Sequence, residues 1–326
     1  MVHSVIADLK SPDLKNIKVA ELPEAPIAAG QVRIRNKHVG INRYDQIAAL
    51  GAHPVLNEQG VLGFEAVGEV LEVAPDVSRL KEGDLVLSAT SPIGGALAES
   101  MVISANHVMP APSDLDPKTL ATCAFKAMFA HSLVTRTYII QEGLPIVIHD
   151  AASALGQFLC TWARGFKALV IGTVADDSEK ELAEESGCHI VYNYNDPEWG
   201  KQILDKTEGY GVAAIYDSVG KAALKQSLLA LGKMGILIMY DSTSGAVESI
   251  PNKILRAKSL FLTVPSLFHY KVNPNELVLS AEQVFHAIKN DVVRPKLLKE
   301  IALDAAPQAI AGIYSEYKSG SVIVNI

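Results

Sequence analysis

The 326-residue chain has few cysteines, no excess of basic residues and no long apolar run. Its three cysteines, Cys123, Cys160 and Cys188, are odd in number and widely spaced, which indicates reduced thiols in a cytoplasmic protein rather than disulfides or a zinc site. The net charge of −7 argues against a nucleic-acid or membrane surface, because both require clustered Lys and Arg. No apolar stretch approaches the ~20 residues that span a bilayer, and the N-terminus lacks the basic-then-apolar pattern of a signal peptide.

The composition is that of a folded globule, with 49% hydrophobic and 20% charged residues. A chain of this length forms one very large domain or two ordinary ones. Residues 1 to about 120 carry short apolar stretches such as Val32–Asn36 and Val67–Val73, separated by turn signals. The segment Lys81–Ser88 adds a turn that leads into a strand. This part of the sequence predicts a small, twisted β-domain with little helix.

The stretch Gly143–Gly172 is the centre of the second part of the chain. It has the pattern of a buried strand, Pro145–His149, a turn of small residues, Asp150–Gly156, a helix, Leu155–Ala163, and a further apolar strand. The N–H groups at the start of such a helix can hold a pyrophosphate. The turn has one glycine rather than three, although Ala and Ser nearly meet the need for small side chains. An ordinary strand–turn–helix unit remains the alternative.

Helices and strands alternate from about residue 118 to 265. The predicted helices are Pro117–Val134, Leu155–Ala163, Ser178–Glu185, Trp199–Thr207 and Lys221–Leu231, and the predicted strands are Pro145–His149, Ala168–Thr173, His189–Tyr192, Ala213–Tyr216, Gly235–Tyr240 and Ser259–Val264. This succession predicts a doubly wound parallel sheet. A helix, Asn275–Asn290, and a last strand, Ser321–Ile326, are expected to return to the β-domain. The predicted domains are therefore residues 1–120 completed by 268–326, and residues 121–267.

Several local strings occur in a specific order along this plan. They are GINRYD (Gly40–Asp45), VLGFEAVGEV (Val61–Val70), KEGDLV (Lys81–Val86), GALAES (Gly95–Ser100), CTWARGFKALVIGTV (Cys160–Val174), YDSVG (Tyr216–Gly220) and SLFLTVPSL (Ser259–Leu267). With the order of domains, they resemble the zinc-independent quinone oxidoreductases of the medium-chain dehydrogenase/reductase superfamily over essentially the whole chain. The resemblance implies a Rossmann-like α/β sheet inserted in a GroES-like, strand-rich catalytic domain.

Two positions bear on metal binding. The zinc alcohol dehydrogenases of this superfamily have a Cys and a His where this chain has Asn42 and Phe64. Phenylalanine has no lone pair to donate, and a neutral Asn is a poor zinc ligand. We therefore expect no metal.

The resemblance places Asn42 beside a nicotinamide and Tyr44 in the substrate pocket. Asn42 has the chemistry to hydrogen-bond the cofactor ribose or an acceptor oxygen, and its alternative role is that of a turn residue. Tyr44 can donate a proton to a developing enolate or quinol oxygen, with simple packing as the alternative.

The expected substrate pocket also contains Ile47, His53, Phe64 and Phe129. Ile47 and His53 stand where relatives often have tyrosines, and Phe129 stands where a Thr near the nicotinamide is usual. A histidine can shuttle a proton near neutral pH, although an exposed loop histidine is the alternative for His53. These differences bear on the identity of the electron acceptor.

Cofactor choice depends on the loop after the second strand of the sheet. That strand ends in the uncharged pair Thr173 and Val174, as in NADP-using relatives, and Lys180 is one position displaced from their phosphate-binding Lys. Acidic residues follow the strand too, namely Asp176, Asp177 and Glu179. Carboxylates here favour NADH by repelling a 2′-phosphate, unless they only cap the next helix. We expect NADPH, with NADH as the alternative.

The remaining cofactor-binding residues are predicted from the resemblance and from the ends of strands. They are Ala154, Leu155 and Gly156 in the turn, Tyr194 on the adenine side, Ser218, Tyr240, Asp241, Ser242, Thr263 and Val264. Asp241 replaces a Gly that is common in the family, and Val264 replaces an Arg.

Together these features predict a cytoplasmic, NADPH-dependent reductase of quinones or related α,β-unsaturated carbonyls that works without zinc. The cofactor carries the hydride chemistry, and the protein positions it and excludes water. The alternatives are an enoyl or alkenal reductase, and a dinucleotide-binding sensor with little turnover. The resemblance also implies a homodimer. The apolar edge near Ser259–Leu267 is its expected interface, with shielding of that edge within one chain as the alternative.

Overall fold

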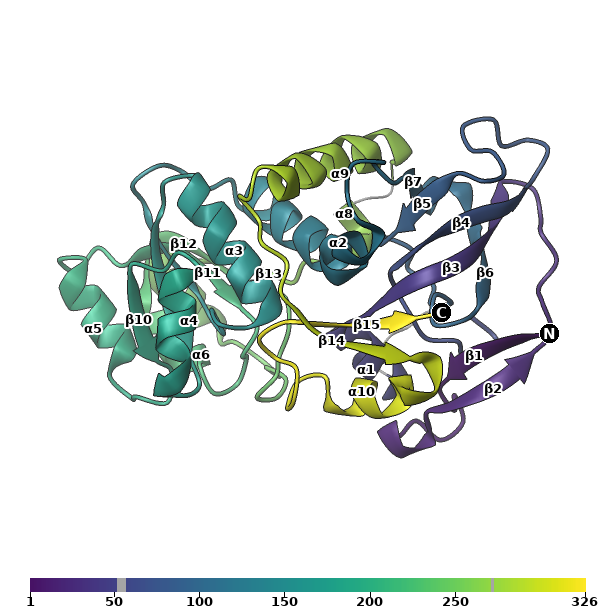
Figure 1. Cartoon of the computed structure of the whole chain (residues 1–326). Coiled ribbons are helices and arrows are strands. Elements are labelled where there is room, and N and C mark those ends of the chain that lie inside the picture. Colours follow the sequence, from purple (N-terminus) through teal and green to yellow (C-terminus); the bar gives the residue numbers. More distant parts are fainter. Residues whose placement is uncertain (52–56, 271–272) are drawn as a thin grey trace. The chain divides into compact units, whose positions relative to one another are not determined.

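The computed structural model describes residues 1–51, 57–270 and 273–326 (Figure 1). The chain forms two compact units, one made of residues 1–128 with the described part of 271–326, and the other of residues 129–270. None of the helices in the described ranges is both long and apolar enough to cross a membrane.

The first unit is built on a seven-stranded sheet. Its strands are β3 (Gln31–Ile41), β4 (Ala66–Val73), β5 (Leu85–Ser88), β6 (Ser100–Ser104), β7 (Val108–Pro110), β14 (Leu297–Ala302) and β15 (Ser321–Asn325). The order is β14-β15-β3-β4-β5-β7, and β6 also pairs with β3. Strand β15 runs antiparallel to β3, which confirms that the C-terminal strand returns to the β-domain. A separate antiparallel pair joins β1 (Val2–Ile6) to β2 (Lys18–Leu22).

The helices of this unit are short except for two. Helix α2 (Pro117–Ser132) confirms the predicted helix. Its residues 117–128 belong to this unit, and residues 129–132, with the π-helical turn Leu133–Thr137, belong to the second. Helix α9 (Pro274–Lys289) confirms the amphipathic helix of the tail. The sequence did not predict α1 (Arg43–Ala49) or α10 (Ala306–Gly312). Each has seven residues, too short to show a clear helical period.

The second unit contains six parallel strands in the order β10-β9-β8-β11-β12-β13, which confirms the doubly wound sheet. The strands are β8 (Pro145–Ile148), β9 (Leu169–Val174), β10 (Ile190–Asn193), β11 (Val212–Asp217), β12 (Leu231–Met239) and β13 (Phe261–Thr263). The helices are α3 (Ala154–Gly165), α4 (Lys180–Glu185), α5 (Trp199–Lys206), α6 (Leu224–Ala230), α7 (Asn252–Lys258) and α8 (Leu267–Tyr270). Helix α6 begins three residues later than predicted, because the turn at Gly220 occupies that segment.

The parallel strands are covered on both faces, as their apolar sequences require. On one face, Val147, Ile215 and Leu237 pack with Trp199 and Ile203 of helix α5. Residues alternate between the faces of a strand, so Ile146, Ile148 and Val170 are directed to the other face. Burial of these side chains is what holds the strand ends in fixed positions.

Candidate functional site

The predicted cofactor residues of the second unit lie at one edge of its sheet. In a parallel sheet the carboxyl ends of all strands share one edge, and each of these residues ends or follows a strand. They are Ala154, Leu155 and Gly156 after β8, Thr173 and Val174 at β9, Tyr194 after β10, Ser218 after β11, Tyr240, Asp241 and Ser242 after β12, and Thr263 and Val264 at β13. Starting from the centre of the sheet, the chain adds β9 and β10 on one side of β8, and it adds β12 and β13 on the opposite side of β11. The neighbours β8 and β11 thus mark the switch point, where doubly wound sheets bind ligands.

The turn between β8 and α3 has the geometry of an anion-binding helix start. Ser153 is the N-cap of α3, and its Oγ accepts a hydrogen bond from the Gly156 N–H (3.1 Å). A Cβ on Gly156 would lie only 2.2 Å from the Asp150 carbonyl oxygen, so no side chain fits there. The first N–H groups of a helix, here those of Ala154 and Leu155, have no intrahelical acceptor. They suit a phosphate oxygen.

Asp150 connects three strand ends, and the sequence analysis did not assign it to the site. Its Oδ2 accepts from the hydroxyls of Ser218 (3.3 Å) and Thr243 (3.5 Å). Its backbone has φ +49°, a region that Asp and Asn tolerate better than most residues. An aspartate in a turn otherwise made of small residues was the available signal.

His149 forms a buried network with Thr173 and Ser227. The Ser227 hydroxyl donates to the Ala223 carbonyl (2.9 Å), so it accepts from His149 Nε2 (2.9 Å). His149 Nδ1 must then accept from the Thr173 hydroxyl (2.6 Å). Burial lowers the pKa of His149 and keeps the ring neutral. The Thr173 hydroxyl is thus directed to His149 within the protein, not offered to a ligand.

The loop after β9 contains one cation among several carboxylates. Lys180 Nζ lies 3.0 Å from Asp177 Oδ1, and the same oxygen accepts from Asn193 Nδ2 (3.1 Å). These contacts lower the pKa of Asp177, with the Lys180 hydrogen bond as the main cause. Asp176 caps the short 3₁₀ turn Asp177–Glu179, which agrees with the capping alternative. Glu179 Oε2 accepts from the Ala175 N–H (3.1 Å).

The other predicted residues of this unit differ in exposure. Tyr240 is buried, its ring meets that of Phe129 edge-on with centroids 6.0 Å apart, and burial raises the pKa of its hydroxyl. Tyr194 packs against the apolar cluster that contains Trp199. Val264 is 70% exposed beside the edge strand β13.

Asn42 ends β3 and starts α1 in the first unit. Its N–H donates to Asp45 Oδ2 (2.7 Å), and the Gly63 N–H donates to Asp45 Oδ1 (2.8 Å). Burial raises the pKa of Asp45 to about 7. The side-chain nitrogen of Asn42 donates to Glu65 Oε1 (2.8 Å), and Lys126 Nζ lies 3.8 Å from the same oxygen. The sequence analysis did not assign Glu65 and Lys126 to the site. Each is a charged residue within an otherwise apolar stretch, and that pattern indicates a buried charge.

Tyr44 lies in an aromatic group. Its ring meets Phe64 edge-on with centroids 6.3 Å apart, and Phe125 with centroids 5.3 Å apart. Tyr44 and Ile47 are both half-buried on α1, whereas His53 lies outside the described residues. Phe64 also lines a cavity of about 170 Å³ in the same unit. In the described part of the chain, no cluster of three or more His, Cys, Asp or Glu could hold a metal ion.

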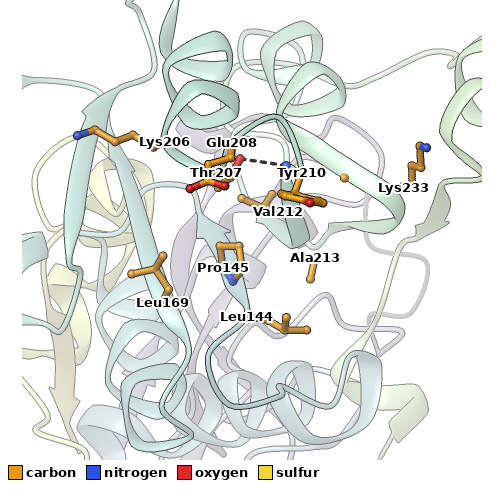
Figure 2. A pocket seen from close by; sticks show the side chains of 12 residues that line it. Leu144, Pro145, Leu169, Lys206, Thr207, Glu208, Tyr210, Val212, Ala213 and Lys233 are labelled. Atoms are coloured by element: carbon orange, nitrogen blue, oxygen red, sulfur yellow. Dashed lines mark hydrogen bonds between the residues drawn. The ribbon is translucent and has the colours of Figure 1, made fainter.

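The second unit also has an open cavity of about 510 Å³ at the opposite edge of its sheet (Figure 2). Pro145, Leu169 and Val212 line it where their strands begin, together with the loop residues Thr207 and Tyr210. Ligands of doubly wound sheets bind at the carboxyl ends of the strands. We therefore do not assign this cavity to the site.

Comparison with known proteins identifies the family. Residues 28–113 match the alcohol dehydrogenase GroES-like domain, and residues 154–270 match the zinc-binding dehydrogenase domain. The chain is 31% identical to a quinone oxidoreductase of Pseudomonas aeruginosa over 90% of both chains, and 33% identical to the 2-haloacrylate reductase of a Burkholderia species over 99% of this chain and 98% of the relative. The crystal structure of Escherichia coli quinone oxidoreductase complexed with NADPH superposes with a TM-score of 0.93 over 100% of both chains, at 27% identity.

These matches define the class as medium-chain oxidoreductases with a GroES-like and a Rossmann-like part. The chain belongs to the quinone oxidoreductase family of the medium-chain dehydrogenase/reductase superfamily. The family and fold predicted from the sequence are therefore confirmed.

Proposed function

We propose that this chain is an NADPH-dependent reductase that passes hydride to quinones or related α,β-unsaturated carbonyls without zinc. The observation that carries the proposal is the turn between β8 and α3, where Gly156 leaves no room for a side chain and a capped helix begins at the switch point. The E. coli relative crystallised with NADPH supports the choice of cofactor.

The residues of the second unit fit a dinucleotide. In the proposal, the N–H groups of Ala154 and Leu155 face the pyrophosphate, Gly156 lets it approach the backbone because no side chain stands there, and Lys180 faces the 2′-phosphate. Tyr194 lies on the adenine side, and the remaining contacts come from the backbone or side chains of Thr173, Val174, Ser218, Tyr240, Asp241, Ser242, Thr263 and Val264. When bound, the reduced nicotinamide supplies the hydride, and the protein orients it and keeps water away.

The first unit supplies the groups for the nicotinamide end and the acceptor. Asn42 offers a hydrogen bond from a buried, rigid position, and Tyr44 is the candidate donor to the acceptor oxygen. By the family resemblance, Ile47, His53, Phe64 and Phe129 are the proposed substrate-contacting residues. The apolar side chains of Ile47, Phe64 and Phe129 suit a flat, conjugated acceptor.

The absence of zinc is proposed from ligand chemistry. Asn42 has its side-chain nitrogen bound to Glu65, and Phe64 is an aromatic residue packed against Tyr44. Neither provides the thiolate or imidazole that zinc enzymes of this superfamily use. A conjugated acceptor is already electron-poor, so hydride transfer to it does not require a Lewis acid.

A second candidate is reduction of an activated carbon–carbon double bond, which the 2-haloacrylate reductase relative favours. Oxidation of NADPH, followed by absorbance with a panel of quinones and enals, tests both. Turnover of quinones supports the main proposal, and turnover of enals alone supports the second. Tight cofactor binding with no turnover of any acceptor would indicate a sensor instead.

Substituting Asp177 with Asn is expected to tighten NADPH binding about 2- to 5-fold and to leave NADH binding unchanged. The change frees Lys180 and removes one charge that repels a 2′-phosphate, and exposed charge pairs contribute ~0.2–1 kcal/mol. Titration of protein fluorescence with each nucleotide measures the effect. Glu142→Gln is the control, since it breaks a similar exposed pair with Lys167 (3.1 Å). Equal tightening of NADH would contradict the assignment of Lys180.

We also propose a homodimer in which two copies pair at the edge strand β13. Phe261, Leu262 and Val264 are 56%, 40% and 70% exposed, an apolar edge that requires a cover. Light scattering should give twice the chain mass of 34.9 kDa. Phe261→Lys should then give monomers, whereas Tyr210→Lys, away from this edge of the sheet, should not. A monomeric parent protein would refute the proposal.

A further inference from the structure

Asn42, Glu65 and Lys126 form a buried cluster in the first unit, and two of these three side chains can carry a charge. Glu65 is fully buried, Lys126 is 9% exposed, and Asn42 is 2% exposed. The three residues come from the segment before β4, from α2, and from the junction of β3 with α1. Buried ion pairs cost desolvation energy and are weak evidence for stability alone, which raises the question of what this one does.

The neighbours of Asn42 determine which way its amide group points. The side-chain nitrogen lies 2.8 Å from Glu65 Oε1 and 3.4 Å from the carbonyl oxygen of Gly40. A carbonyl oxygen and an ionised carboxylate can only accept hydrogen bonds. The amide nitrogen must therefore face Glu65 and Gly40. The amide oxygen takes part in the capping box of α1 with the backbone N–H of Asp45, and its second lone pair is what Asn42 can offer to a ligand.

Three further contacts fix the Glu65 carboxylate itself. The Phe125 N–H donates to its second oxygen, Oε2 (2.6 Å). Lys126 Nζ lies 3.8 Å from Oε1 and donates to the carbonyl oxygen of Ile41 (3.5 Å). A Cβ on Gly40 would lie 2.0 Å from Oε1, so the strand presses against the carboxylate. Both oxygens of Glu65 are therefore held in contacts, and one of them is directed to Asn42.

We propose that Lys126 and Glu65 are positioning residues that hold Asn42 as a hydrogen-bond acceptor toward the bound nucleotide. The partner of Asn42 is then a hydroxyl or amide N–H of the nicotinamide nucleotide, and not the carbonyl oxygen of the substrate, which is itself an acceptor. This inference rests on the proposed function. It selects between the two partners that the sequence left open for Asn42.

The charge state of Glu65 controls the arrangement. Burial raises the pKa of Glu65, and Lys126 opposes that shift. Asp45 and Cys123 are the other titratable groups beside the cluster. Without Lys126, the Glu65 carboxyl takes up a proton at a higher pH and becomes a donor. The shorter of the two contacts that hold the Asn42 nitrogen inward is then lost, and the amide can rotate to present its nitrogen, which cannot accept.

The first test is Lys126→Met, with the Kd of NADPH measured by fluorescence from pH 6 to 9. We expect binding about tenfold weaker at pH 6.5, the value of one hydrogen bond of ~1.4 kcal/mol, and recovery toward the parent value at pH 9. Lys118→Met is the matched control on the same helix, because Lys118 pairs with the partly exposed Glu300 (2.7 Å). Parent-like binding by Lys126→Met at every pH would overturn the proposal.

A second variant remains informative if Lys126→Met folds poorly. Glu65→Gln combined with Lys126→Met has no buried charge at either position. The Phe125 N–H needs an acceptor, so the oxygen of the new glutamine faces it and the glutamine nitrogen faces Asn42. That nitrogen is a donor at every pH, so the Asn42 amide rotates to place its own oxygen toward it. We expect weak NADPH binding that raised pH does not restore. Parent-like affinity in this double variant would also overturn the proposal.

A third measurement does not involve the cofactor. In protein labelled with ¹⁵N-asparagine, the Asn42 side-chain amide, assigned with Asn42→Ala, should titrate with Glu65 in Lys126→Met but stay constant in the double variant. If the Asn42 resonance shows the same pH dependence in Lys126→Met as in the parent protein, the positioning role is contradicted. If the parent protein binds no nicotinamide nucleotide, the proposed function fails, and the resonance still reports on the cluster.

Discussion

Gly156→Ala should raise the Kd for NADPH about 100-fold or more, equivalent to ~3 kcal/mol of binding free energy. The new Cβ would lie 2.2 Å from the Asp150 carbonyl oxygen and 3.0 Å from Ala151, and both contacts are with the turn that starts α3. The turn must open to admit the methyl group, which moves the N–H groups of Ala154 and Leu155. Calorimetric titration with NADPH measures the loss.

Gly165→Ala is the matched control in the same helix. Nothing lies within 4 Å of a Cβ at that position. Alanine in a helix is more favourable than glycine by ~0.5–1 kcal/mol, so this variant should be as stable as the parent or more so, with unchanged NADPH affinity. Parent-like binding by Gly156→Ala would show that the turn does not hold the cofactor.

His149→Leu is expected to destabilise the second unit by ~2–5 kcal/mol. Leucine has a similar volume but leaves the hydroxyls of Thr173 and Ser227 buried without the imidazole, and each lost partner costs ~1–3 kcal/mol. Urea unfolding measures the change. His269→Leu, an exposed histidine in the same unit, should alter the free energy of unfolding by no more than ~0.5 kcal/mol.

The same histidine predicts how stability depends on pH. Burial lowers the pKa of His149 below the value of ~6.5 expected in the unfolded chain, so the unfolded state binds more protons as the pH falls. The contribution is fully present above pH ~6.5 and is lost on acidification below it. Between pH 7 and 5, His149→Leu should therefore lose less stability than the parent protein. Equal slopes would mean that His149 does not titrate differently on unfolding.

Much of the fold follows from local patterns in the sequence. The alternation of short apolar runs with helical segments predicted the six parallel strands, because such runs must be buried on both faces. The pattern missed α1, where polar Asn42 and Asp45 are buried inside the protein. Burial of those residues depends on Gly63 and Glu65, which lie 18 to 23 residues away in the chain. Local periodicity does not contain that information.

The sequence predicts those candidate site residues that end or follow a strand of the parallel sheet. The parallel topology brings the residues after each strand to one edge, so candidates such as Ser218 and Tyr240 follow from the order of strands along the sequence. Side-chain pairing does not follow in this way. The sequence predicts Thr173 as a cofactor contact, but it does not reveal that the Thr173 hydroxyl bonds His149, a partner 24 residues earlier. Lys126 was overlooked because its partner Glu65 comes from another element.

The burial of all three cysteines has a chemical consequence for an enzyme of the proposed kind. Cys123, Cys160 and Cys188 are free thiols with at most 5% exposure, and Cys160 and Cys188 face each other with their sulfurs 3.4 Å apart. Burial raises the pKa of Cys123 and Cys160, so little of the nucleophilic thiolate forms. Quinones and enals are Michael acceptors that alkylate accessible thiolates. If the proposed substrates are the right ones, none of the three thiols is exposed enough to attack them, and we expect the enzyme to resist alkylation at cysteine.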